Sequence, residues 1–159
     1  MKAEIINCFV EALETTLLEN GAFALLHNNK KVLDYINEND RVRIIICLFG
    51  GSTIQGTVVI TMDQEIAFSI IGAMIGGIKI NEIDSIGISA LGEYTNWIIS
   101  STAKKVQAFG EKITNFKVDI EEKLYKSEEK KSYSEGNGTF LSFGYLIDTH
   151  EMEMSVNIT

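Results

Sequence analysis

The stretch that decides the fold runs from Asp84 to Phe109 and reads DSIGISALGEYTNWIISSTAKKVQAF. At about 100° per residue, its apolar residues gather on one side of a helix and its polar residues on the other. We therefore predict one long amphipathic helix over 84–109, with its apolar side facing a core. That side comprises Ile88, Leu91, Ile98, Ile99, Val106 and Phe109.

The opposite side of this helix is polar, and we expect Tyr94 and Trp97 at its flanks. Glu93 and Asn96 are three residues apart, so their side chains project from the helix as neighbours. The spacing alone is weak support for a site, because Glu4 and Asn7 repeat it. The polar side comprises Ser89, Glu93, Asn96, Ser100, Lys104 and Gln107.

The chain before this helix predicts two further helices and a hairpin. Residues 4–18 carry apolar residues at helical spacing, led by Ile5, Phe9, Leu13 and Leu17. Residues 42–49 form a β-branched run of strand length, and 54–61 form a second, with Gly50-Gly51-Ser52 between them. A helix begins near Thr61 or Asp63 and ends at Gly76-Gly77.

The chain after the long helix predicts three strands. They cover 113–120, 139–147 and 152–158, and the last two form a hairpin. Residues 121–138 are charged and rich in serine, which predicts an exposed loop. Helices and strands are segregated along the chain, so we predict an α+β fold. Its mostly antiparallel sheet has two long helices packed on one face, in a single domain over 1–159.

The composition of the chain excludes several classes of function. The formal net charge is −8, so phosphate backbones are repelled and we expect no nucleic-acid partner. No apolar run approaches the roughly 20 residues that span a bilayer, and no signal peptide is visible. We therefore expect a cytoplasmic protein that does not act at a membrane. Cys8 and Cys47 are expected to be buried reduced thiols, and with His27 and His150 they form no metal motif.

Three segments in order carry a resemblance to a known family. The first pairs Leu48–Gly51 with Gly56–Ile60, and the second runs from Ala67 to Gly77. The third holds Leu91-Gly92-Glu93-x-x-Asn96, followed by small residues and Ala103-Lys104. Together these segments resemble the hairpin, second helix and signature helix of the CheC/CheX/FliY phosphatase family. The resemblance covers roughly residues 42–105, and Trp97 stands where the family has a smaller aliphatic residue.

The number of signature helices decides between branches of the family. CheC-like members carry the signature twice, whereas here Glu4 and Asn7 lack the preceding Leu-Gly and the following Ala-Lys. We interpret that second match as a coincidence. A single signature helix resembles the CheX branch, whose members are homodimers with one site per subunit, so the resemblance implies a homodimer.

The resemblance also implies a reaction. Such a protein hydrolyses the aspartyl phosphate of a CheY-like response regulator in chemotaxis, or two-component, signalling. Asn96 is implied to orient the attacking water, and Glu93 to form a salt bridge with the regulator's active-site lysine. No cofactor of its own is implied, since the bound regulator supplies Mg2+. We further expect partner contacts from Ser89, Trp97, Ser100 and Lys104.

Two alternatives stay open at this stage. The first is a non-enzymatic module that binds a phosphorylated regulator, as in motor-switch or adaptor proteins of the same fold. The second is an α+β domain whose exposed Glu93 and Asn96 have no function. Glu93 and Asn96 together favour catalysis over the binding module.

Overall fold

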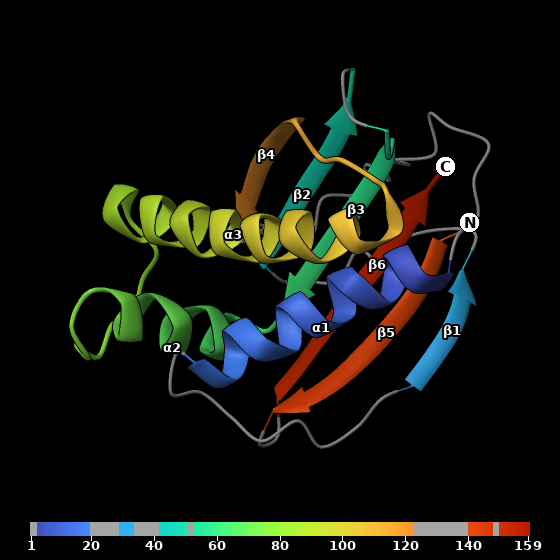
Figure 1. Cartoon of the computed structure of the whole chain (residues 1–159). Coiled ribbons are helices and arrows are strands. Elements are labelled where there is room, and N and C mark those ends of the chain that lie inside the picture. The colour runs from blue at the N-terminus through green and yellow to red at the C-terminus, as the bar shows by residue number, and fades with distance from the viewer. Residues whose placement is uncertain (1–2, 20–28, 34–41, 51–52, 123–139, 148–149) are drawn as a thin grey trace.

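The computed structural model describes residues 3–19, 29–33, 42–50, 53–122, 140–147 and 150–159. Its described strands form a six-stranded sheet in the order β1-β5-β6-β3-β2-β4, and every neighbouring pair is antiparallel (Figure 1). The predicted α+β fold with a mostly antiparallel sheet is therefore confirmed. The strands are β1 (Asn29–Leu33), β2 (Val42–Phe49), β3 (Gly56–Met62), β4 (Asn115–Glu122), β5 (Phe140–Ile147) and β6 (His150–Ile158).

Three helices lie over one face of this sheet (Figure 1). They are α1 (Ala3–Glu19), α2 (Gln64–Met74) and α3 (Ser85–Val106), and α3 continues into a 3-10 turn, η1 (Gln107–Phe109). The two long helices, α1 and α3, pack against each other, and α2 packs against α3. None of the described helices combines the length and the apolar character needed to cross a membrane.

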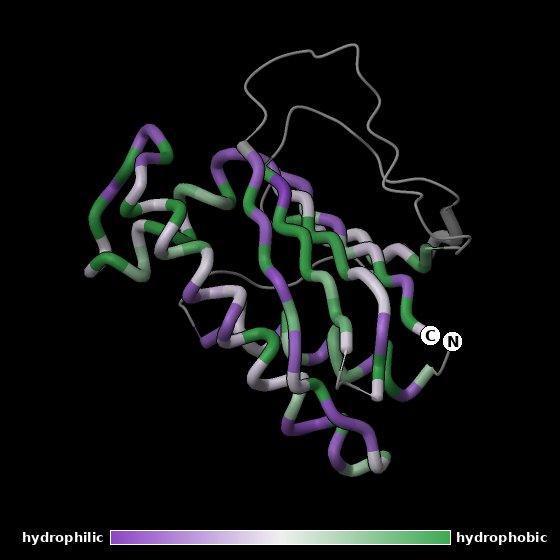
Figure 2. Tube along the Cα trace, turned by 90° about the horizontal axis from the view of Figure 1, so that it is seen from above, coloured by the Kyte–Doolittle hydropathy of each residue, from purple (hydrophilic) through white to green (hydrophobic). Residues whose placement is uncertain are grey.

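The strands contribute alternate residues to the core between the sheet and the helices, as period-two geometry requires. On β2 these include Ile44, Ile46 and Leu48, which join Val58 and Ile60 of β3 in one cluster with the helices. Figure 2 shows the central strands largely in the green of hydrophobic residues. This core fixes α3 on the sheet and leaves its outer side exposed.

The opposite face of the sheet is also buried along its middle strands. Ile45 and Val59 form a small apolar cluster there with Phe140. Arg43, 1% exposed, pairs with Glu121 of β4 at 3.3 Å. Burial of an arginine is tolerated when a carboxylate compensates its charge.

The sequence predicted most element positions to within a few residues. Strand β1 was not predicted, because residues 27–40 are polar apart from three aliphatic positions. The prediction that Phe109 is buried is wrong, because this residue is 52% exposed. The α-helix ends at Val106 and η1 turns with a different angle per residue, so the helical extrapolation fails there. Most of the predicted loop 121–138 lies outside the described residues.

Candidate functional site

Helix α3 carries the candidate site, and local sequence fixes where it begins. Asp84 is its N-cap, and one oxygen of the Asp84 carboxylate accepts a hydrogen bond from the Gly87 N–H at 2.8 Å. Such a cap satisfies one of the amide groups left unpaired at a helix start. At the other end, Lys104 and Lys105 lie in the last turn, where positive charge complements the helix dipole.

The inner side of α3 is buried against the core, and its threonine hydroxyls are hydrogen-bonded. Leu91 and Ile98 are fully buried in the main core. Two threonines share this side, and each donates its hydroxyl to the carbonyl one turn earlier: Thr95 to Leu91 at 2.7 Å and Thr102 to Ile98 at 2.8 Å. Buried hydroxyls satisfied in this way cost little, so the helix is held firmly beneath the site.

The outer side of α3 presents the residues that the sequence singled out. Glu93 and Asn96 are both exposed and lie about one turn apart. The other residues for which the sequence predicts partner contacts are also exposed on this helix. Exposed with Glu93 and Asn96 are Ser89, Trp97, Ser100, Lys104 and Gln107.

The exposed face also has an apolar margin. Trp97 is 44% exposed, as its predicted flanking position implies, and Ile86 is 62% exposed. Ile86 precedes Glu93 by seven residues, which places both on the same side of the helix. Sequence reasoning missed Ile86 because it counted only polar residues on this side, although the seven-residue spacing was visible. The face thus combines the Glu93 carboxylate and the Asn96 carboxamide with two large apolar side chains.

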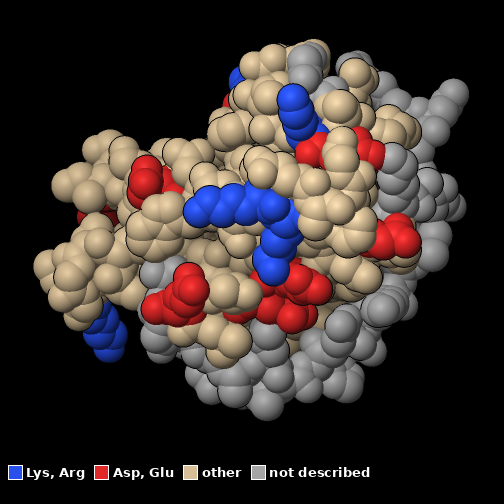
Figure 3. Space-filling view, in the orientation of Figure 1, with Lys and Arg blue, Asp and Glu red and all other residues tan. Residues whose placement is uncertain are grey.

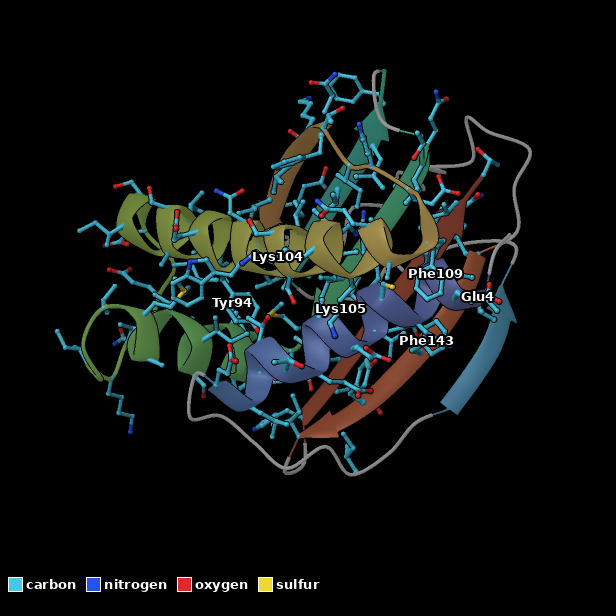
Figure 4. The ribbon with its side chains drawn as sticks, viewed as in Figure 1. Glu4, Tyr94, Lys104, Lys105, Phe109 and Phe143 are labelled. Atoms are coloured by element: carbon cyan, nitrogen blue, oxygen red, sulfur yellow. The ribbon has the colours of Figure 1, made fainter. Side chains whose placement is uncertain are left out.

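Tyr94 corrects one expectation about this helix. It was placed at a flank, yet its side chain is fully buried, pointing from α3 towards the other helices (Figure 4). Its hydroxyl finds no hydrogen-bond partner among the described residues. Burial raises the pKa of Tyr94 well above its usual range. The large ring fills space between helices, which a wheel drawn for α3 alone does not reveal.

The two lysines in the last turn of α3 point in different directions. Lys105 turns away from the exposed face and forms a salt bridge with Glu11 of α1 at 3.0 Å (Figure 4). Lys104 points outward from the same turn. Figure 3 shows lysine side chains across the middle of this view with acidic groups around them. Glu93 and Lys104 are therefore the charged residues that α3 offers on its exposed side.

The described residues include no group of three His, Cys, Asp or Glu side chains able to hold a metal ion. Cys8 is buried, and Cys47 is partly buried. Burial, with Glu11 nearby, raises the pKa of the Cys8 thiol. A buried thiol with a raised pKa is a poor nucleophile, so Cys8 is not a candidate catalytic residue. The chemistry available on the exposed side of α3 is that of the Glu93 carboxylate and the Asn96 carboxamide.

The α+β fold, an antiparallel sheet with helices over one face, is that of CheC/CheX-like proteins. The family described as "Chemotaxis phosphatase CheX" matches residues 43–143. The chain therefore belongs to the CheX family. A relative from Thermotoga maritima, named CheY-P phosphatase CheX, is 24% identical over 113 residues, which are 71% of this chain and 72% of the relative.

Solved structures share the fold. A CheC-like superfamily protein from Shewanella sp. PV-4 superposes with a TM-score of 0.81 at 16% identity, covering 100% of this chain and 99% of the other. A chain of the CheX-CheY-BeF3-Mg+2 complex from Borrelia burgdorferi superposes with a TM-score of 0.63 at 17% identity, covering 99% of both chains. At these identities the likeness shows the fold.

Proposed function

We propose that this chain is a phosphatase that hydrolyses the aspartyl phosphate of a CheY-like response regulator, with Glu93 and Asn96 inserted into the regulator's active site. The observation that carries the proposal is their exposure, one turn apart, on the outer side of α3 in a member of the CheX family. The buried, capped inner side of α3 supports it, because a helix that inserts into a partner must hold its geometry.

Asn96 is the residue proposed to orient the attacking water. A carboxamide offers a donor and an acceptor together, so it can fix a water in one orientation. Being neutral, it adds no repulsion against the phosphoryl group. The water attacks phosphorus in line, its P–O bond forms as the bond to the aspartyl oxygen breaks, and inorganic phosphate and the free carboxylate leave. Phosphoryl transfer of this kind depends mainly on positioning and charge stabilisation.

Glu93 is proposed to hold the complex in register. A carboxylate beside a phosphoryl group is repulsive by itself, so its presence on this face calls for a cation on the partner. The regulator's active-site lysine supplies that cation, and the resulting charge-assisted pair fixes where Asn96 sits. Ser89, Trp97, Ser100 and Lys104 surround the pair and are proposed to contact the regulator's surface.

The metal ion is proposed to come from the partner. The relative from Borrelia burgdorferi was solved with CheY, a phosphate mimic and magnesium in one complex. On this chain, α3 offers a single exposed carboxylate, and one such ligand does not make a magnesium site. Mg2+ held by the regulator would supply neutralisation of the charge on the phosphoryl oxygens, and this chain's Asn96 would hold the attacking water.

A phosphate-release assay tests the proposal. Each CheY-like regulator of the source organism is phosphorylated with a small phosphodonor, the donor is removed, and phosphate release is followed with and without the chain. We expect release with at least one regulator to be faster than its spontaneous rate. A regulator that binds the chain yet loses phosphate at its spontaneous rate would support the binding module instead. A chain that neither binds nor accelerates any regulator would contradict both.

We further propose a homodimer with one Glu93/Asn96 face per subunit. Strands β1 and β4 end the sheet that the described strands form, and edge strands present backbone groups for pairing with a second chain. Light scattering at micromolar concentration tests the assembly state. We expect a mass near twice the 17.7 kDa of one chain. A mass near that of a single chain would contradict the dimer.

A further inference from the structure

Three glycines lie within the described helices: Gly72 in α2, and Gly87 and Gly92 in α3. Glycine inside a helix is unfavourable compared with alanine, since it gives up more backbone freedom on folding. Each of these positions therefore needs a reason why a side chain is absent. A close approach of other atoms is the usual reason, and the packing around each glycine shows whether it applies.

The structure supplies that reason for two of the three. A Cβ at Gly72 would lie 2.4 Å from the Ile78 carbonyl oxygen, a contact with backbone that cannot yield. A Cβ at Gly87 would lie 3.3 Å from Ile71 Cδ1 and from Ile83 Cγ2, tighter than ordinary packing. Gly72 allows the segment after α2 to pack closely on α2, and Gly87 allows α2 and that segment to approach α3 closely.

Gly92 has no such reason within the described residues. A Cβ there would have Ile120 Cδ1 of β4 as its nearest described neighbour, 4.0 Å away, which is ordinary van der Waals contact. An alanine at this position would add packing against β4 and would also favour the helix. The internal packing seen in the structure thus favours a side chain at a position where the sequence has none.

The place of Gly92 on α3 points to an external cause. It directly precedes Glu93 and lies one turn before Asn96, on the same side of the helix. Side chains on a helix lean towards its N-terminus, so the Asn96 side chain is directed over the turn that holds Gly92. The missing Cβ leaves the α3 backbone bare beside the carboxamide of Asn96.

We propose that Gly92 is a clearance position for the phosphorylated partner. The inference rests on the proposed function and adds a positioning residue to it. The regulator's loop that carries the phosphorylated aspartate comes into van der Waals contact with the α3 backbone at Gly92. That approach brings the phosphoryl group within reach of a water held by Asn96. A methyl group at Gly92 holds the loop away from the helix and misaligns the water, although it leaves the fold intact.

The test compares Gly92→Ala with Gly87→Ala in the full chain. The probe is a CheY-like regulator of the source organism loaded with beryllofluoride and Mg2+. We expect Gly92→Ala to raise the melting temperature by about 2–4 °C. It should also weaken binding to the loaded regulator by about tenfold, as one overpacked methyl group implies. Gly87→Ala should leave the affinity of the folded protein within about threefold, because Gly87 faces α2 and lies away from the proposed interface.

The outcomes separate this inference from the proposed function. If wild type binds the loaded regulator and Gly92→Ala binds it equally well, the clearance role alone is overturned. A Gly92→Ala variant that melts at a lower temperature also overturns it, because Gly92 would then serve internal packing. If wild type neither binds nor dephosphorylates any regulator, the proposed function fails and this inference fails with it. A stabilised variant with weakened binding supports the clearance role, since a purely structural role would move both quantities in the same direction.

Discussion

The chain contains two Glu-x-x-Asn pairs, and their surroundings differ more than the pairs themselves do. Glu4 and Asn7 lie on α1, and Glu93 and Asn96 lie on α3; all four side chains are exposed. In both pairs the residue after the glutamate turns into the core, Ile5 in one and Tyr94 in the other. Spacing and exposure therefore do not distinguish a site from an ordinary solvated helix face.

The positions around each pair do distinguish them. Asn96 is followed by the exposed Trp97, whereas Asn7 is followed by the buried Cys8. One turn further on, α3 has Ser100, whereas α1 has Glu11. The outer side of α1 thus carries two carboxylates, and that of Glu11 forms a salt bridge with Lys105. Glu4 has a simpler role there, because a carboxylate in the first turn stabilises the helix dipole.

The largest expected difference between the two pairs is catalytic. Asn96→Ala should lower dephosphorylation of the regulator by at least about 100-fold, the scale expected when a positioning group is lost. Asn7→Ala is the matched control and should leave the rate within about twofold, as exposed substitutions do. Single-turnover phosphate release measures both, and circular dichroism confirms that both variants fold. Equal rates for the two variants would remove the distinction between the helices.

The second difference concerns affinity. Glu93→Lys places a cation opposite the regulator's lysine and should weaken binding by at least about 30-fold. Glu4→Lys makes the same charge change on α1 and should weaken binding by less than about threefold. Isothermal titration with the beryllofluoride-loaded regulator measures both. If Glu93→Lys bound as tightly as wild type, the lysine pairing would be wrong.

The third difference lies beneath the pairs and affects stability. Tyr94 buries a hydroxyl that has no hydrogen-bond partner among the described residues, whereas Ile5 buries none. Tyr94→Phe removes that hydroxyl, so the free energy of unfolding should rise by about 1 kcal/mol. The melting temperature should rise by about 2–4 °C. Calorimetry measures the change, and a clear loss of stability would show that the hydroxyl is satisfied. Phosphate release by this variant should equal that of wild type.

The smallest expected effect belongs to Lys104. It is the cation on the outer side of α3, at the rim of the proposed interface. Lys104→Ala should weaken binding about two- to threefold at low salt, mainly by slowing association. The difference should disappear at high ionic strength, because salt screens exposed charges. Stopped-flow association at two salt concentrations measures this, and an effect that persists at high salt would place Lys104 inside the interface.

Helical periodicity predicted correctly which side of α3 is exposed, because the exposure of Glu93, Asn96 and Ser100 depends only on a regular helix. Periodicity failed where packing against other elements, or a change of helix type, decides whether a side chain is buried. Tyr94 is buried by packing between helices, and Phe109 is exposed because the helix tightens into η1. Strand β1 escaped prediction because its sequence, Asn-Lys-Lys-Val-Leu, has little strand preference, and pairing with β5 forms it. The sequence also could not show that internal packing does not require a glycine at position 92, since only the structure shows the neighbours of each glycine.

The central claim is that α3, and not α1, enters the regulator's active site. The most direct test is a crystal structure of this chain bound to a CheY-like regulator loaded with beryllofluoride and Mg2+. We expect the Asn96 carboxamide within hydrogen-bond distance, about 3 Å, of a water in line with the beryllium. The Glu93 carboxylate should lie within about 4 Å of the regulator's lysine. A complex in which the regulator contacts Glu4 and Asn7, or in which Asn96 faces solvent, would contradict the account.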